Sequence, residues 1–203
     1  MKAAEPRRRG RPSSFDRAQA LDSAMRLFWQ RGYEGTSMDE LIRVMGLSPS
    51  SLYAAFGNKQ QLYHAAIERY AAGPGSFAAR VLASEPTARA GIERLLQVAA
   101  AELTKPDQPM GCMVALALTH GSADIEPLQA MMTERRVQSR RIMEERIATG
   151  VQAGELPADT NVPALARMFA ALFHGMSIQA RDGATREELE AVARVAMGAW
   201  PSS

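Results

Sequence analysis

The sequence predicts an all-α protein of about nine helices, in which an N-terminal three-helix helix-turn-helix domain precedes a C-terminal helical domain. Apolar residues recur at helical spacing in one segment after another. Breaks that contain glycine or proline, such as Gly73-Pro74-Gly75, separate these segments, and no strand-like alternation bounded by turns occurs. We expect a basic arm, disordered in isolation, over 1–13, the helix-turn-helix domain over 14–72 and the second domain over 73–203.

Length and composition exclude several classes of protein. The chain has 203 residues, of which 46% are apolar, and a single cysteine, so it cannot form an internal disulfide. It has no run of roughly 18 apolar residues that would span a membrane, and no signal-peptide core follows the basic N-terminus. We therefore expect a cytoplasmic protein that does not contact a membrane.

Positive charge is concentrated in the N-terminal third. Residues 1–69 hold eleven Lys and Arg against seven Asp and Glu, a net +4, whereas residues 70–203 hold thirteen against fifteen, a net −2. The arm contributes Arg7, Arg8, Arg9 and Arg11. Its Arg-Gly-Arg-Pro run resembles the core of an AT-hook, in which arginines enter a narrow A·T-rich minor groove. The alternative is a solvated tail without a partner.

The first helix is expected over 14–31. Leu21, Met25 and Phe28 fall on one face, which gives the amphipathic pattern of a helix that packs on a core. Ser14 is a candidate N-cap, and Gly32 suits a left-handed residue at the C-terminus.

The next two helices form the helix-turn-helix. Thr36 or Ser37 can cap the first of them, with an acidic residue three positions later to complete a capping box. Gly46 lets the chain turn, and Ser48 can cap a second helix that has Pro49 in its first turn. In DNA-binding proteins the second helix of this motif lies in the major groove. An ordinary helical hairpin is the alternative.

Small and polar residues occupy the expected outer face of the second helix. Ser50, Ser51 and Tyr53 fit against base edges and phosphates. A longer helix follows from Asn58, with Lys59 in its first turn. A lysine there opposes the positive end of the helix, so a DNA phosphate nearby would make the placement favourable.

The C-terminal half predicts helices near 86–104, 109–120, 124–153, 160–181 and 185–200. The last two are apolar on more than one face, which suggests a partner outside their own domain. We predict a homodimer in which two such helix pairs form a four-helix bundle. The candidate interface residues are Leu165, Leu172, Gly175, Leu189, Val192, Val195, Ala196 and Trp200.

The run from Ala20 to Tyr70 resembles the DNA-binding domain of the tetracycline-repressor (TetR) family of bacterial regulators, and is similar to its AcrR-like branch. The resemblance includes G-Y-E-G-T-S, M-G-L-S and S-L-Y-x-x-F-x-N-K. It extends more loosely into the C-terminal half, which in this family is a ligand-binding and dimerisation domain. For DNA contact the resemblance implies phosphate binding by Thr36, Ser37, Tyr53 and Lys59, and base contact by Pro49, Ser50 and Ser51. Two alanines follow Tyr53 at positions where some family members carry an aromatic residue and a histidine, so readout would depend more on Ser50, Ser51, Arg43 and the arm.

The same resemblance implies a small-molecule pocket in each C-terminal domain and a palindromic operator as the DNA partner. Occupancy of the pocket by a small apolar effector would change the separation of the two recognition helices. The candidate lining residues are Cys112, Met113, Leu116, Met132, Met143, Met168, Phe169, Phe173 and His174.

Cys112 has two possible roles. An expected helix start at 109–111 would favour its thiolate, and Gly-Cys-Met resembles the motif of electrophile- and oxidant-responsive TetR regulators. A small buried apolar residue is the commoner role of a lone cysteine.

We expect no cofactor, no catalytic residues and no metal site. The chain's three histidines, His64, His120 and His174, lack metal-ligand spacing. Nucleotide-binding, nucleophile-elbow and zinc-protease motifs are also absent from the sequence. The function predicted is therefore a DNA-binding regulator, most simply a repressor released by an effector, with activation as an alternative. A helical adaptor that binds protein is the second hypothesis, and an enzyme with a carboxylate pair formed only on folding is the third.

Overall fold

The structure is a computed structural model that describes residues 15–118 and 123–201. These residues form nine α-helices and two short 3₁₀ turns, with no strand, which confirms the predicted all-α class within the described ranges. The helices are α1 Arg17–Arg31, α2 Met38–Met45, α3 Pro49–Phe56, α4 Lys59–Ala72, α5 Phe77–Ser84, α6 Ala88–Leu103, α7 Glu126–Gln152, α8 Val162–Arg181 and α9 Arg186–Met197.

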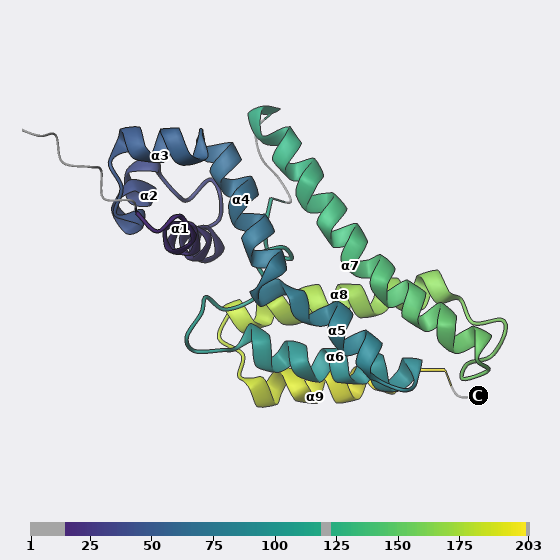
Figure 1. The fold of residues 1–203 in the computed structure, drawn as a ribbon. Coiled ribbons are helices and arrows are strands. Elements are labelled where there is room, and N and C mark those ends of the chain that lie inside the picture. The colour runs from purple at the N-terminus through teal and green to yellow at the C-terminus, as the bar shows by residue number, and fades with distance from the viewer. Residues whose placement is uncertain (1–14, 119–122, 202–203) are drawn as a thin grey trace, which may run out of the picture.

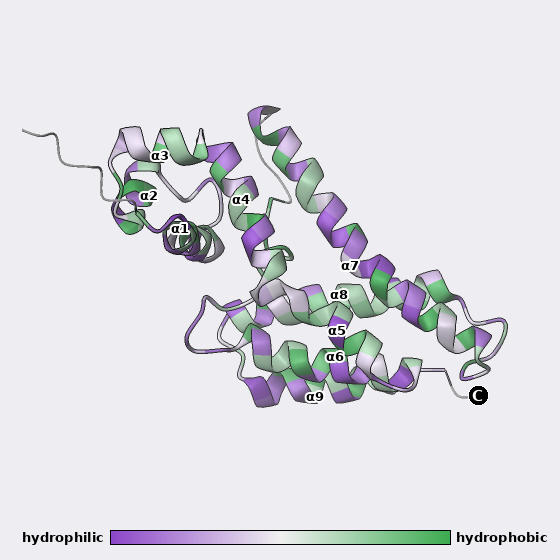
Figure 2. Ribbon diagram, viewed as in Figure 1, coloured by the Kyte–Doolittle hydropathy of each residue, from purple (hydrophilic) through white to green (hydrophobic). Residues whose placement is uncertain are grey.

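The first three helices form a small unit at one end of the molecule, and α4 runs from this unit into the larger helical body (Figure 1). In that body α6 contacts α5, α7, α8 and α9, and α9 also packs on α8. The long α7 runs obliquely beside α4, and its first turn reaches the level of α3. The view in Figure 2 shows hydrophilic residues along much of α7, whereas α6 and α8 show more hydrophobic positions.

The first helix is capped two residues later than expected, at Asp16 instead of Ser14. Asp16 is the N-cap, because its side chain accepts hydrogen bonds from the backbone N–H groups of Ala18 and Gln19 at 2.9 and 3.1 Å. The proposed cap Ser14 lies outside the described residues. Gly32 ends the helix with φ of 74°, as expected for a glycine at this position.

Aromatic rings fill the core of the N-terminal unit. The ring of Tyr63 from α4 meets Phe28 of α1 edge-on at 5.0 Å and Tyr33 at 5.1 Å. Leu41 of α2 and Leu52 of α3 are fully buried in the same core. The side chain of Asp22 accepts two hydrogen bonds from Arg69, at 2.7 and 2.9 Å, so α1 and α4 are joined at the surface as well.

The predicted helix over 109–120 is wrong across its described residues 109–118, which form turns and irregular chain. Pro106 and Pro109 interrupt helical hydrogen bonding, and Gly111 has φ of 80°. A Cβ on Gly111 would lie 2.8 Å from the carbonyl oxygen of Ser177, so only glycine fits there. The helix count agrees nonetheless, because α5 was not among the predicted segments. The other four C-terminal helices agree with prediction to within three residues.

The expected break at Gly73-Pro74-Gly75 is present and includes a 3₁₀ turn over Pro74–Ser76. Gly75 packs on the ring of Tyr70, where a Cβ would come within 2.6 Å of the ring carbon Cε1. This close contact holds the 3₁₀ turn against the end of α4. Within residues 15–118 and 123–201, no helix combines the length and apolarity that a membrane span requires.

Candidate functional site

The helix-turn-helix is held by local caps. The side chain of Ser37 accepts from the Glu40 N–H, and the Glu40 side chain accepts from the Ser37 N–H, so the predicted capping box is present. Gly46 adopts the left-handed conformation, with φ of 65° and ψ of 31°, and the buried Leu47 follows it. These contacts set the angle at which α3 leaves the turn.

The outer face of α3 agrees with the sequence analysis. Ser48 caps the helix, accepting from the Ser51 N–H at 3.2 Å. Pro49 and Ser50 are exposed, Ser51 is half-buried, and the side chain of Tyr53 is 53% exposed. Since the opposite face of α3 is buried in the domain core, this face is free to enter a groove of duplex DNA.

Two of the predicted phosphate ligands lie in different surroundings from those expected. Thr36 is 1% exposed, and its hydroxyl donates to the Gly32 carbonyl at 2.7 Å. Its side chain therefore stabilises the end of α1 and cannot reach a phosphate as it stands, which leaves Ser37 as the exposed hydroxyl at this turn. The ammonium of Lys59 lies 4.3 Å from the centre of the Tyr33 ring, and partial burial lowers its pKa.

Arg43, in the last turn of α2, is exposed on the same domain. The arginines expected to enter the minor groove, Arg7, Arg8, Arg9 and Arg11, lie outside the described residues.

The C-terminal body contains a cavity of about 350 Å³. Most of its lining is apolar, with contributions from Phe77 of α5, Leu95 of α6, Met143 of α7 and Phe173 of α8. Tyr70 of α4 also lines it, so the helix that follows α3 forms part of the cavity wall. This size and apolarity are typical of sites for small organic ligands.

Three of the nine residues predicted to line a pocket do so, namely Cys112, Met143 and Phe173. The other six residues do not line this cavity. Met132 and Phe169 are fully buried elsewhere in the core, whereas Met168 is 38% exposed. Met113 and Leu116 line a separate cavity of about 290 Å³ near the end of α1. His174 is half-buried beside the Phe173 ring, and burial lowers its pKa.

Cys112 lies in an irregular segment and not at a helix start, so the predicted effect of a helix N-terminus on its thiol does not apply. The residue is 7% exposed, and its Sγ accepts a hydrogen bond from the Tyr70 hydroxyl at 3.3 Å. Its N–H donates to the hydroxyl of the buried Ser177 at 2.7 Å. Burial, followed by the neighbouring Cys112, raises the pKa of Tyr70 well above its ordinary value, so this phenol remains a donor at neutral pH.

A second contact joins this segment to the helix-turn-helix domain. The indole N–H of Trp29 in α1 donates to the Gly111 carbonyl at 3.0 Å. The same ring meets Tyr70 edge-on at 4.8 Å. The cavity wall and the N-terminal unit are therefore in direct contact through one aromatic pair.

Comparison with protein families decides the relationship. The model described as "Bacterial regulatory proteins, tetR family" matches residues 20–66, and the model "Tetracyclin repressor-like, C-terminal domain" matches residues 86–196. The chain belongs to the TetR family. It is therefore a helix-turn-helix transcriptional regulator, as the sequence predicted.

Individual relatives agree with this TetR assignment over nearly the whole chain. The HTH-type transcriptional repressor ComR of Escherichia coli K12 is 34% identical over 197 residues, which cover 95% of this chain and 92% of ComR. A structure of a CifR cysteine mutant, a TetR family regulator complexed with 26-bp operator DNA, is 41% identical with a TM-score of 0.91. The match covers 94% of this chain and 100% of that one. A putative TetR regulator from Rhodococcus sp. RHA1 is 36% identical, with a TM-score of 0.62 and coverage of 93% and 100%.

The two closing helices of this TetR chain carry an apolar surface. Val195 is 81% exposed, and the sequence analysis missed Ile178, which is 51% exposed on α8. By contrast, three residues proposed for a dimer interface are buried inside the subunit: Leu165, Leu189 and Trp200. The Trp200 ring packs 5.8 Å from that of Phe169, so it belongs to the core of its own chain. The remaining candidates, Leu172, Gly175, Val192 and Ala196, are half-buried.

Among the described side chains, no group of three or more His, Cys, Asp or Glu residues is placed to hold a metal ion.

Proposed function

We propose that this TetR regulator is a repressor that binds a palindromic operator as a homodimer and leaves it when a small molecule occupies the cavity. The observation that carries the proposal is the outer face of α3, where exposed Pro49, Ser50 and Tyr53 stand opposite a buried inner face. Two relatives support it: ComR is named a transcriptional repressor, and CifR is described in complex with operator DNA.

The proposed dimer forms through α8 and α9. Exposed apolar side chains such as Ile178 and Val195 favour burial against a second copy. A two-fold pair would present two α3 helices to successive major grooves, which lie about 34–36 Å apart. This geometry requires a palindromic operator.

The proposed release mechanism acts through α4. Tyr70 belongs to this helix and lines the cavity, and α4 follows α3 after only two residues, Gly57 and Asn58. A ligand that fits only when α4 shifts would stabilise the shifted state, and this would move both α3 helices away from their operator spacing.

Cys112 offers a second proposed trigger, because it lines the cavity and contacts Tyr70. A small electrophile that enters the cavity would alkylate the thiol and leave a bulky group against α4. The test is operator binding after complete modification with iodoacetamide, with Cys112→Ser as the unreactive control. Unchanged binding of the modified protein removes this trigger and leaves reversible occupancy as the proposed one.

The experiment that tests the proposed function is the salt dependence of affinity for DNA from the protein's own upstream region. Each phosphate contact contributes about −0.9 to the slope of log K against log[salt], so several contacts per subunit give a steep slope. In this proposal Arg43 contacts a phosphate as well as contributing to readout, so Arg43→Gln should reduce the slope by about 1 per subunit. The matched control is Arg94→Gln, which removes one exposed positive charge from α6 in the other domain.

A flat slope, or the absence of binding to any genomic fragment in a pull-down, would refute operator binding. That result would favour the alternative of a helical adaptor that binds protein. Equal effects of the Arg43 and Arg94 substitutions would show that charge alone matters and that α2 and α3 do not form the DNA-contacting surface.

A further inference from the structure

The cavity holds one charged side chain among the described residues that line it. Arg135 of α7 reaches the cavity beside Gln138 and Ser139 of the same helix, while Phe77 and Phe173 contribute apolar surface. No acidic residue belongs to this described lining. The cavity therefore combines an apolar interior with a single positive group.

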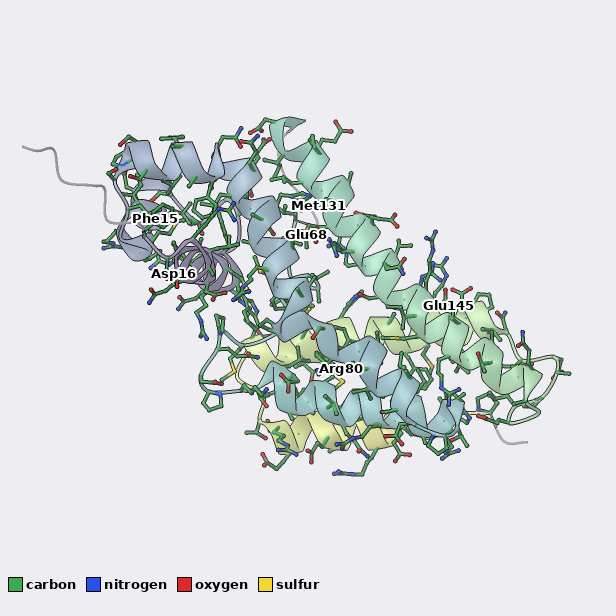
Figure 3. The ribbon with its side chains drawn as sticks, in the orientation of Figure 1. Phe15, Asp16, Glu68, Arg80, Met131 and Glu145 are labelled. Carbon is green, nitrogen blue, oxygen red and sulfur yellow. The ribbon has the colours of Figure 1, made fainter. Side chains whose placement is uncertain are left out.

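Arg135 is already paired with a residue on another helix. Its Nη2 donates to Oε1 of Glu68, in the C-terminal half of α4. Figure 3 shows Glu68 on the side of α4 that faces α7. The side chains of Arg135 and Glu68 are 33% and 49% exposed, so this is a solvent-accessible ion pair, of a kind that contributes little and can be exchanged.

We propose that the cavity binds an amphipathic anion, whose apolar body lies among the aromatic residues and whose carboxylate takes the place of Glu68 on Arg135. This inference rests on the proposed function in one respect, that the cavity is the effector site. The reason for an anion is the charge of the lining, because a neutral ligand leaves the Arg135–Glu68 pair intact and an amine would be repelled. A carboxylate can accept two parallel hydrogen bonds from a guanidinium, which makes it a strong competitor for Glu68.

Replacement of Glu68 by the ligand carboxylate would act on the DNA-binding domain through α4. Before α7 begins, the Asp124 carbonyl accepts from Nε2 of Gln60 in the first turn of α4, at 2.8 Å. Together with Arg135–Glu68, this contact joins the α7 segment to α4 at two levels. Loss of the Arg135–Glu68 pair would free the C-terminal half of α4 from α7. This half of α4 also carries the ion pair between Arg69 and Asp22 of α1. A ligand that displaces Glu68 from Arg135 lowers the population of the α4 position that requires the Arg135–Glu68 pair, because binding and this position are thermodynamically linked.

The test measures ligand binding to the DNA-free, full-length protein by calorimetry, using octanoate, 1-octanol and octylamine as probes of matched length. We expect octanoate to bind at least about fivefold more tightly than octanol, and octylamine to bind more weakly than either. Arg135→Gln should abolish the preference for octanoate while leaving octanol affinity unchanged. Glu68→Gln should raise octanoate affinity by up to about fivefold, because the internal competitor is gone, and should not affect octanol.

Glu134→Gln is the matched control. Glu134 is an acidic residue on α7 that lies 3.8 Å from Arg141 and does not line the cavity, so its loss tests for an effect of overall charge. The inference is overturned if no carboxylate from hexanoate to decanoate binds more tightly than its matched alcohol. It is equally overturned if Glu68→Gln changes octanoate affinity no more than Glu134→Gln does.

The proposed function and the anion inference are tested by separate measurements, so either can be refuted without the other. Operator affinity of the ligand-free protein tests the proposed function, and the carboxylate-to-alcohol ratio, measured without DNA, tests the nature of the ligand. Operator binding combined with equal affinities for octanoate and octanol would remove the anion inference and leave the regulator in place.

Discussion

Replacing Trp29 with phenylalanine tests the contact that joins α1 to the cavity wall. The indole is 3% exposed and its N–H donates to the Gly111 carbonyl at 3.0 Å, while the ring packs edge-on against Tyr70. Phenylalanine keeps an aromatic ring beside Tyr70 but removes the donor. The substitution therefore leaves a buried carbonyl without this partner and a small void where the indole was.

The expected loss follows from these two terms. An unsatisfied buried acceptor costs about 1–3 kcal/mol, and the smaller ring costs about 1 kcal/mol more in lost packing. We expect Trp29→Phe to lower the free energy of unfolding by about 2–4 kcal/mol. Trp200→Phe is the matched control, because Trp200 is similarly buried at 6% exposure and packs on Phe169 away from the α1 contact. It should lose only the packing contribution, about 1 kcal/mol.

The assay is urea denaturation followed by far-ultraviolet circular dichroism, at one fixed chain concentration because association would change the apparent stability. An equal loss for the two variants would refute the reasoning, since it would mean that the Trp29–Gly111 hydrogen bond contributes nothing beyond packing. A shift in slope without a shift in midpoint would also contradict it, because the loss would then come from a change in the unfolded state.

Further predictions concern the caps, the ion pairs and the dimer. Ser48→Ala removes the N-cap of α3, which should lower stability by about 1 kcal/mol in a thermal melt and should also lower operator affinity. Thr87→Ala removes the N-cap of α6 and should leave operator affinity unchanged. The hydrogen bond from Arg69 lowers the pKa of Asp22, so their pair should stabilise the fold above about pH 4 and lose this contribution as pH falls through the folded pKa. Asp22→Asn should therefore reduce the difference in unfolding free energy between pH 6 and pH 3, and an unaltered difference would contradict this. Val195→Asp should shift sedimentation from dimer to monomer, because it places a charge in the proposed interface, and a persistent dimer would move that interface elsewhere.

Local signals in the sequence were sufficient for the helix-turn-helix. Ser37, Gly46, Ser48 and Asn58 were each expected at a helix boundary, and each caps or ends a helix in the structure. Capping and turn formation depend on residues two to four positions apart, so sequence spacing contains the necessary information. Thr36 was the exception, because its burial depends on how α1 packs beside it.

The cavity could not be predicted in the same way. Arg135 and Glu68 are 67 positions apart, and Tyr70 and Cys112 are 42 apart, so only the tertiary course of the chain brings them together. The sequence did indicate that methionines and aromatic residues would cluster in the C-terminal half, but helical periodicity does not distinguish a residue that lines a cavity from one that fills the core.

By itself the sequence determined the helical class, the helix-turn-helix and its exposed polar face, because these follow from short-range periodicity and hydrogen bonding. Tertiary structure decided which apolar faces are internal. Leu189 and Val195 share the helix α9 and are both apolar, yet one is fully buried and the other 81% exposed. The difference arises because the neighbouring helices cover only one side of α9, and the course of those helices depends on contacts between residues far apart in the chain.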